Sequence, residues 1–177
     1  MPSAVVKWGM VVEAIAWVAP AINALIEQQV LPNTGYHVVV CDPNYRHQLT
    51  NDHDRDQANW ERSGILFQCS YGPPEIGRIG DQITPVNAIA RSKAFRSSVN
   101  NCSTRYLLQN RIFTLEFNDT IYFGSAVREG WCVAISGFPP DLDEMVSNWI
   151  IDALLAICRL QAEQIKLQAV DGFLVQN

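Results

Sequence analysis

The chain has 177 residues, of which 48% are apolar and only 18% are charged, with a formal net charge of −5. This length favours a single domain over residues 1–177 that buries about two-thirds of its unfolded surface. The acidic balance argues against nucleic acid and anionic membranes as partners, because both attract clusters of Lys and Arg. The scarcity of charge indicates extra apolar surface, which self-association would cover.

The first predicted element is an apolar helix from Trp8 to about Val30. Pro20 removes a backbone donor and is expected to kink or split this helix. Glu13 and Asn23 interrupt the apolar run, which argues against a membrane span or a signal peptide. Because the helix is apolar around most of its circumference, we expect a sheet to cover one side, with a second subunit as a candidate cover for another.

Two strands and a second helix are predicted next. The β-branched run at 36–43 predicts a strand, and 64–72 predicts another. Between them, the polar connection 44–63 has no regular periodicity, which is typical of a functional lid or a disordered excursion. A loop with Gly and Pro follows at 73–82. Thr84 and Pro85 then favour a helix start, so a helix is predicted over 85–100.

The second half of the chain predicts more strands and a last helix. Strand-like runs at 111–117, 120–127 and 131–137 are separated by turn signals and are expected to form an antiparallel meander. Acidic residues at 141–144 favour the start of a helix that fades near 166–168. This order of elements predicts an α+β domain in which an antiparallel five-stranded sheet is packed with helices.

The cysteines bear on the cellular compartment. There are five, an odd number, and none shows Cys-x-x-Cys spacing. This usage indicates free thiols in a reducing, cytoplasmic compartment. A nucleophilic cysteine paired with a histidine is the functional alternative, and it needs a proximity that the sequence does not give.

Two stretches, 87–107 and 131–144, carry a family resemblance. In both, small, hydroxyl-bearing and charged residues stand at recurring places: Ala90, Lys93-Ala94, Ser103-Thr104, Ser136-Gly137 and Asp143. This pattern resembles the GlcG/HbpS family, the haem-degrading or haem-binding-like domains that also form the C-terminal part of PduO-type proteins. The resemblance implies a domain that assembles into dimers or higher oligomers and holds a small ligand near its sheet or a subunit boundary.

The resemblance also implies haem as a candidate cofactor. A histidine is the ordinary axial ligand of haem, but His37, His47 and His53 lie in or just after the first strand and in the polar connection, away from both long helices. We therefore expect no resident cofactor. We also expect no metal site, because the chain lacks a plausible zinc quartet and the run from Asp52 lacks the Gly and Glu of a calcium loop.

Several residues are candidates for holding a ligand. Four cations fall within fifteen residues of this acidic chain: Arg91, Lys93, Arg96 and Arg105. They could bind a carboxylate, phosphate or enolate, or they could form a solvated basic face or pair with acidic residues of a neighbouring subunit. Trp60 is a candidate for stacking on a flat ligand. Trp131 is a further candidate, with a sheet or interface aromatic as the alternative.

Three residues are candidates for proton transfer: His53, Glu116 and Lys93. Carboxylates on both sides of His53 would raise its pKa, although a solvated loop is the structural alternative. Glu116 alternates with apolar neighbours, so it is either a buried carboxylate with a raised pKa or an ordinary exposed one. Lys93 lies among small and apolar residues on its helix, which brings its stem close to the apolar side.

Two functions follow from these patterns and remain open. The first is a cytoplasmic, homo-oligomeric GlcG/HbpS-like protein that binds a small, partly apolar organic molecule between its sheet, the 85–100 helix and the 44–63 connection. The second is a cofactor-independent enzyme on the same scaffold, such as an isomerase, lyase or cyclase. A purely structural oligomer is a third alternative. The chain has no Walker, GxGxxG, HExxH or GxSxG motif.

Overall fold

The structure is a computed structural model that describes residues 4–31, 35–45, 52–72, 76–79, 82–115 and 119–167. In this described part, four antiparallel strands form the central sheet in the order β2-β1-β6-β5. They are β1 (Tyr36–Cys41), β2 (Ile65–Tyr71), β5 (Ser125–Arg128) and β6 (Trp131–Ser136). The α+β class with an antiparallel sheet is therefore confirmed.

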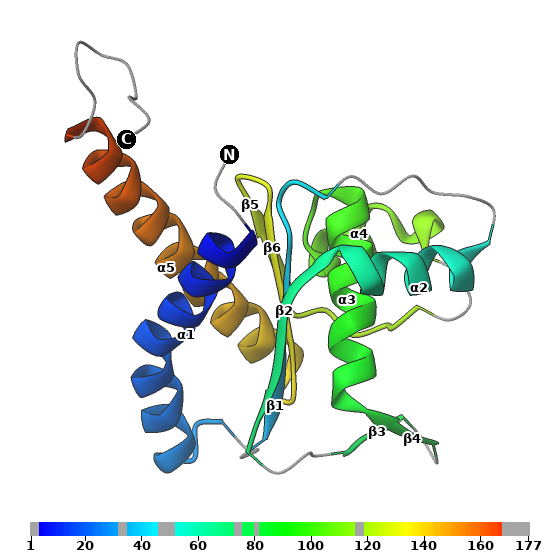
Figure 1. Cartoon of the computed structure of the whole chain (residues 1–177). Coiled ribbons are helices and arrows are strands. Elements are labelled where there is room, and N and C mark those ends of the chain that lie inside the picture. The colour runs from blue at the N-terminus through cyan, green and yellow to red at the C-terminus, as the bar shows by residue number, and fades with distance from the viewer. Residues whose placement is uncertain are drawn as a thin grey trace.

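Helices cover both faces of this sheet (Figure 1). The first and last helices, α1 (Ala4–Glu27) and α5 (Pro140–Leu167), lie together on one face. The opposite face carries α3 (Val86–Asn100). Because both faces are covered, the central strands are buried along their whole length and do not alternate between apolar and polar residues.

Side chains alternate between two cores. Val38 of β1 and Val133 of β6 point into the larger core beneath α1 and α5, which also holds Trp131. Val39 and Cys132, their neighbours in the chain, point into the smaller core beneath α3. Two helices, Lys7–Glu27 and Pro140–Lys166, are long and apolar enough to cross a membrane by length and composition alone. Both contribute to the larger core, and buried helices of soluble proteins pass the same test, so this observation is weak evidence for a membrane.

The helix predicted from Trp8 to Val30 is confirmed, with shifted ends. It runs from Ala4 to Glu27 and continues through Pro20 as one element.

The connection 44–63 is more ordered than we predicted from its lack of periodicity. Its second half is helix α2 (His53–Ser63), and the Asp52 side chain caps the helix by accepting a 3.0 Å hydrogen bond from the Arg55 amide. Asp56 and Trp60 lie one turn apart on α2 and are both buried. The cap and this pair of inward positions account for a helix that the polar composition concealed.

Two other segments differ from the prediction. The expected loop 73–82 contains part of a two-stranded hairpin, formed by β3 (Ile76–Ile79) and β4 (Gln82–Pro85). The strand expected over 111–117 is not formed at 112–114, which make a single 3₁₀ turn, η1 (Ile112–Thr114). The described part of the sheet therefore has four strands and not the five predicted.

The region before η1 explains that difference. Ser103 accepts a 3.3 Å hydrogen bond from the Tyr106 amide and so caps a short helix, α4 (Thr104–Asn110). The chain reaches the sheet again only at Ser125, five residues later than expected. A two-residue turn at Glu129-Gly130, where both residues have positive φ, then joins β5 to β6 as predicted.

Candidate functional site

A pocket of about 360 Å³ opens where α3 ends, beside the start of α4, the strand β5 and the first turns of α5. Its lining is mostly polar and comes from all of these segments: Asn101, Cys102, Ser103, Tyr106, Ser125, Ala126, Val127, Glu144 and Asn148. The volume lies at the lower end of the ~300–1,000 Å³ range of ligand pockets. The site therefore has room for a small molecule.

Helix capping shapes one wall of the pocket. Asn101 ends α3 in the left-handed conformation, with φ 52°, and Ser103 begins α4 two residues later. This tight junction brings three consecutive residues, Asn101, Cys102 and Ser103, into the lining of the pocket. Asparagine is among the residues that adopt the left-handed region at least cost.

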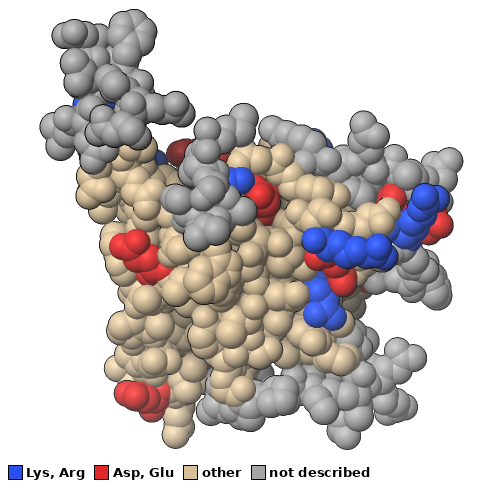
Figure 2. Space-filling model, in the orientation of Figure 1, with Lys and Arg blue, Asp and Glu red and all other residues tan. Residues whose placement is uncertain are grey.

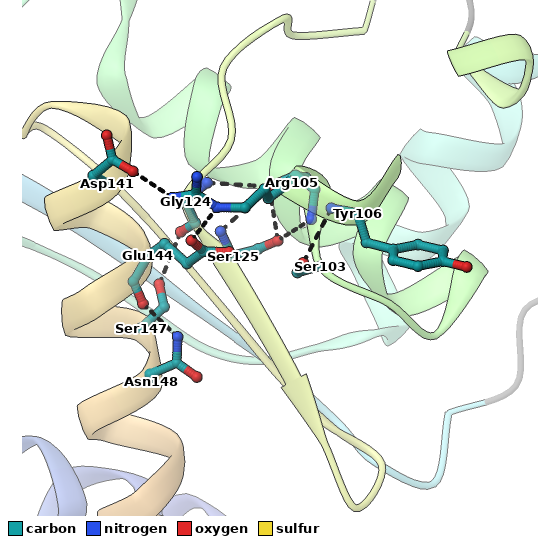
Figure 3. A network of polar contacts seen from close by, with 10 residues as sticks. Ser103, Arg105, Tyr106, Gly124, Ser125, Asp141, Glu144, Ser147 and Asn148 are labelled. Carbon is teal, nitrogen blue, oxygen red and sulfur yellow. Dashed lines mark hydrogen bonds and ion pairs between the residues drawn. The ribbon is translucent and has the colours of Figure 1, made fainter. Parts of the chain in front are cut away.

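The inner wall is a buried hydroxyl network (Figure 3). The Ser125 hydroxyl lies 2.6 Å from the Ser97 hydroxyl and 2.9 Å from that of Thr104, and it accepts a 2.9 Å bond from the Thr104 amide. The Thr104 hydroxyl in turn accepts from the amides of Gly124 and Ser125, at 3.1 and 3.3 Å. These bonds join α3, α4 and β5, so the wall of the pocket is held in one arrangement.

Gly124 connects this network to α5. Its carbonyl oxygen accepts bonds from the Ser147 hydroxyl at 2.8 Å and from the Ile135 amide at 3.2 Å. Gly124 has φ +136°. A Cβ at this position would overlap the Asp143 Cβ and lie 2.9 Å from the Lys93 ammonium. Only glycine fits here without displacing either group.

Behind Gly124 lies a buried ion pair between α3 and α5. The Lys93 ammonium donates to a carboxylate oxygen of Asp143 at 2.7 Å and to the Ile135 carbonyl at 2.9 Å. The other Asp143 oxygen accepts from the Phe138 amide at 3.0 Å. The two side chains are only 1% and 2% exposed. Lys93 is thus a structural link between α3, β6 and α5, and it does not line the pocket.

Burial alters the proton affinity of both partners. It raises the pKa of Asp143 to about 6, although the Lys93 charge and the Phe138 amide act in the opposite direction. Burial also lowers the pKa of Lys93, against the attraction of Asp143. In both cases the loss of hydration outweighs the ion pair, since each charged form is costly away from water.

We expect Asp143 to make the free energy of unfolding depend on pH between about 4 and 6. The folded state holds this proton up to about pH 6, whereas the ordinary pKa is 3.8. The folded state therefore binds more protons in this window, and stability falls as the pH rises through it. A rise in pKa from 3.8 to about 6 corresponds to about 3 kcal/mol.

Urea denaturation at several pH values checks this expectation. The control is the double variant Lys93→Met/Asp143→Asn, which lacks the titrating group. The stability of the wild type minus that of the variant should decrease by about 2 kcal/mol between pH 4 and pH 6, the part of the full ~3 kcal/mol that falls inside this window. A constant difference across the window would show that folded Asp143 titrates normally.

Arg105 spans the rim of the pocket. Its Nε donates to Glu144 at 2.6 Å, its second terminal nitrogen pairs with Asp141, and its guanidinium lies 4.0 Å from the centre of the Phe123 ring (Figure 3). Arg105 was predicted to bind ligand anions. The structure instead shows its charge engaged by two carboxylates, Asp141 and Glu144, near the start of α5.

The other predicted ligand-binding residues lie away from this pocket. Trp60 is fully buried against Phe95 in the smaller core, with ring centres 5.4 Å apart, so it does not stack on a ligand as predicted. Trp131 is buried in the larger core on the opposite face of the sheet, which favours the structural alternative. This packing fills the place between the sheet, α3 and α2 where we had predicted the ligand.

The remaining cations of α3 are paired. The Arg91 Nε lies 3.4 Å from a Glu61 carboxylate oxygen on α2, and Arg96 makes a 2.5 Å bond to the nearly buried Asp119. Each of the four predicted cations therefore has its own carboxylate partner, and Arg105 has two. The four side chains do not converge on one anion.

The side chains of two predicted catalytic residues lie outside the described part of the structure. His53 is the first residue of α2, and its side chain is outside the described part. Glu116 also lies outside the described residues. Lys93, the third, is sealed in its ion pair.

The thiol that lines the pocket shows no sign of an activated nucleophile. Burial raises the pKa of Cys102, the cysteine that lines the pocket, although Arg111 partly opposes the shift. Thiolates are the reactive form, so this shift disfavours nucleophilic chemistry at the pocket. All five cysteines are free, as predicted.

Sequence reasoning missed most of the residues that line the pocket. Ser125 and Asn148 lie in segments that we interpreted only as strand and helix. Ser103 offered a signal, because serine is a common N-cap residue and Ser103 directly precedes the first residue of α4. Glu144 was interpreted only as part of a helix start.

The lining of this pocket contains no histidine among the described residues, so the ordinary axial ligand of haem is not present there. Cys102 and Tyr106 are in the lining, and both are residue types that can ligate haem iron. In the described ranges, no group of three His, Cys, Asp or Glu side chains could hold a metal ion.

Comparison with protein-family models, curated proteins and solved structures found no match to this chain.

Proposed function

We propose that this protein binds a small organic molecule in the pocket between α3, α4, β5 and α5. The observation that carries the proposal is the pocket itself, about 360 Å³ with polar side chains on its walls. The hydrogen bonds of Ser125 and Thr104 hold its inner wall in place. The wall therefore loses little conformational entropy when a ligand binds. Pre-organised polar groups of this kind are typical of ligand sites.

We further propose that the chain is a GlcG/HbpS-like protein. The two stretches that carry the resemblance come together at the pocket. The first supplies Lys93 and the Ser103-Thr104 pair, and the second supplies Asp143, which bonds Lys93 at 2.7 Å. Residues shared with the family would then serve mainly to build the site, with Ser103 lining it directly.

Binding is favoured over the alternative of a cofactor-independent isomerase, lyase or cyclase. Proton transfer needs an acid or base within reach of the ligand. The carboxylate that lines the pocket, Glu144, is already bonded to Arg105 at 2.6 Å. The buried position of Lys93 removes it from direct proton transfer.

We also propose that the protein is a cytoplasmic homo-oligomer that associates through α1. Trp8, Val12 and Trp17 are 51%, 38% and 49% exposed on this helix. The surface over α1 is mostly free of charged residues (Figure 2). The cation at its start, Lys7, is turned inward to Asp42 at 2.9 Å. Without exposed cations, this face suits another copy of the chain better than an anionic lipid surface. The five free cysteines support a reducing compartment.

Native mass spectrometry of the protein purified from its own source tests ligand and assembly together. We expect a particle of at least two 19.8 kDa subunits that carries a small organic molecule. Trp17→Lys should convert the particle to a monomer, because it places a charge in the apolar contact, and should leave the bound mass in place.

Each part of the proposal can fail separately in this experiment. A wild-type monomer with bound ligand would exclude the α1 interface. An oligomer that remains empty, and that takes up no compound from a metabolite extract, would exclude the ligand site.

A further inference from the structure

Resting on the proposed function, we infer that the pocket selects a hydroxyl-bearing molecule and discriminates against anions. The charges around the pocket carry the inference. Arg105, at the rim, is shared by Asp141 and Glu144, so this group of three retains a net negative charge. The pocket itself has one charged side chain, that of Glu144.

Two other cations close to the pocket are neutralised, and a third, Arg111, is exposed to solvent with its guanidinium 5.5 Å from the centre of the Tyr106 ring. Arg128 pairs with Asp152 and donates to the Asn148 side-chain oxygen at 2.9 Å. Lys93, behind the inner wall, is 1% exposed and held by Asp143. An anionic ligand would have to displace a carboxylate from Arg105 or lie beside Glu144, with Arg111 as its counter-charge. The first two contacts cost binding free energy in a partly desolvated site, whereas the attraction of an exposed cation such as Arg111 is weakened by water and salt.

The rest of the lining suits hydroxyl groups. Asn101, Ser103 and Tyr106 bring an amide, an aliphatic hydroxyl and a phenol to the pocket, and each can donate and accept hydrogen bonds. Ala126 and Val127 add a small apolar surface on β5 for carbon–hydrogen faces. A polyol or monosaccharide combines these two properties without carrying charge.

Cys102 provides a local readout of occupancy, since it lines the pocket and is partly exposed. The full chain is treated with iodoacetamide at mildly alkaline pH, and peptide mass spectrometry gives the rate at which Cys102 is alkylated. Cys69 on β2 is a half-buried internal control away from the pocket. The probes are three sugars of nearly equal size. Glucose is uncharged, glucuronate carries a negative charge and glucosamine carries a positive charge.

We expect glucose to slow alkylation of Cys102 but not of Cys69, and glucuronate to need at least about tenfold higher concentration for the same protection. Glucosamine should protect at least as well as glucose, because the Glu144 carboxylate attracts its positive charge. Glu144→Gln should narrow the difference between glucose and glucuronate, because it removes the charge that repels the anion. Glu163→Gln, the same change on an exposed part of α5, should leave the ratio unaltered.

Equal or better protection by glucuronate would overturn the inference, as would weaker protection by glucosamine than by glucose. If none of the three probes protects Cys102 while native mass spectrometry finds a bound molecule that does, the pocket binds ligand and the hydroxyl preference is wrong. If no molecule protects Cys102 and none is bound, the proposed function fails with it.

Discussion

Replacing Lys93 with methionine is expected to lower the free energy of unfolding by about 3–5 kcal/mol at about pH 8, the cost of removing one partner of a buried ion pair. The Asp143 carboxylate would lose both its counter-charge and a 2.7 Å hydrogen bond in a place that is 2% exposed. The Ile135 carbonyl would lose a donor at 2.9 Å as well. Urea denaturation gives the change directly.

The double variant Lys93→Met/Asp143→Asn is expected to recover most of this loss. No charge then remains buried, and the amide oxygen at position 143 can still accept the Phe138 amide. Lys166→Met is the matched control, because Lys166 pairs with Glu163 in solvent and should contribute about 0–1 kcal/mol. If the single and double variants were equally unstable, the two side chains would not be coupled and Lys93 would act through packing alone.

This expectation changes how a Lys93 variant should be interpreted. From the sequence, loss of turnover or of affinity in Lys93→Ala would separate an enzyme from a binding protein. In the structure, Lys93 joins α3 to β6 and α5 behind the pocket. A Lys93 variant would therefore disturb the pocket by weakening the fold, and activity measurements on it need a stability measurement beside them.

Substituting Gly124 with alanine is expected to destabilise the protein by about 3 kcal/mol or more. Its φ of +136° is strained for any residue with a Cβ, at about 1–3 kcal/mol. The added methyl would also overlap Asp143 and press on the Lys93 ammonium, and overpacking costs a further ~1–3 kcal/mol. Ligand binding should weaken together with stability, because Gly124 also anchors Thr104 and Ser147 at the pocket wall.

Gly9→Ala is the matched control for that variant. Gly9 lies inside α1, and a Cβ there would meet no heavy atom within 4 Å. Alanine should therefore raise stability by about 0.5–1 kcal/mol through its better helix propensity. A small effect at Gly124, comparable with that at Gly9, would mean that the chain around β5 can relax and that the pocket wall is not rigid. Thermal or urea denaturation of the two variants side by side decides this.

The elements that were predicted correctly have strong local signals. β1 and β6 are short apolar runs rich in β-branched residues, and α5 has acidic residues in its first turn followed by a helical apolar pattern. The elements that were missed have polar or mixed sequences. Among the α2 side chains that the structure describes, only Asp56 and Trp60 are buried, so no continuous apolar stripe marks the helix. At 112–114, the apolar pattern resembles a strand, yet Phe113 is 81% exposed on a 3₁₀ turn.

The candidate site was harder to predict than the fold. Lys93 stood out in the sequence as a cation among apolar neighbours, and this burial is real, but the partner that explains it is fifty residues away in α5. Trp60 was noted as a large aromatic beside a polar segment, which is equally consistent with stacking on a ligand and with anchoring a helix. Residues such as Ser125 and Asn148 have no local feature that separates them from ordinary strand and helix positions.

The sequence by itself determined the α+β class, the antiparallel central strands and the two long apolar helices, because hydrophobic period, capping residues and turn signals act over a few neighbouring residues. Only the tertiary structure decided which charged side chains form ion pairs and which polar groups line the pocket. Pairs such as Lys93 with Asp143 and Arg105 with Glu144 join residues that are 50 and 39 positions apart. Electrostatics and hydrogen bonding depend on distance in space, and that distance exists only after the helices have packed on the sheet.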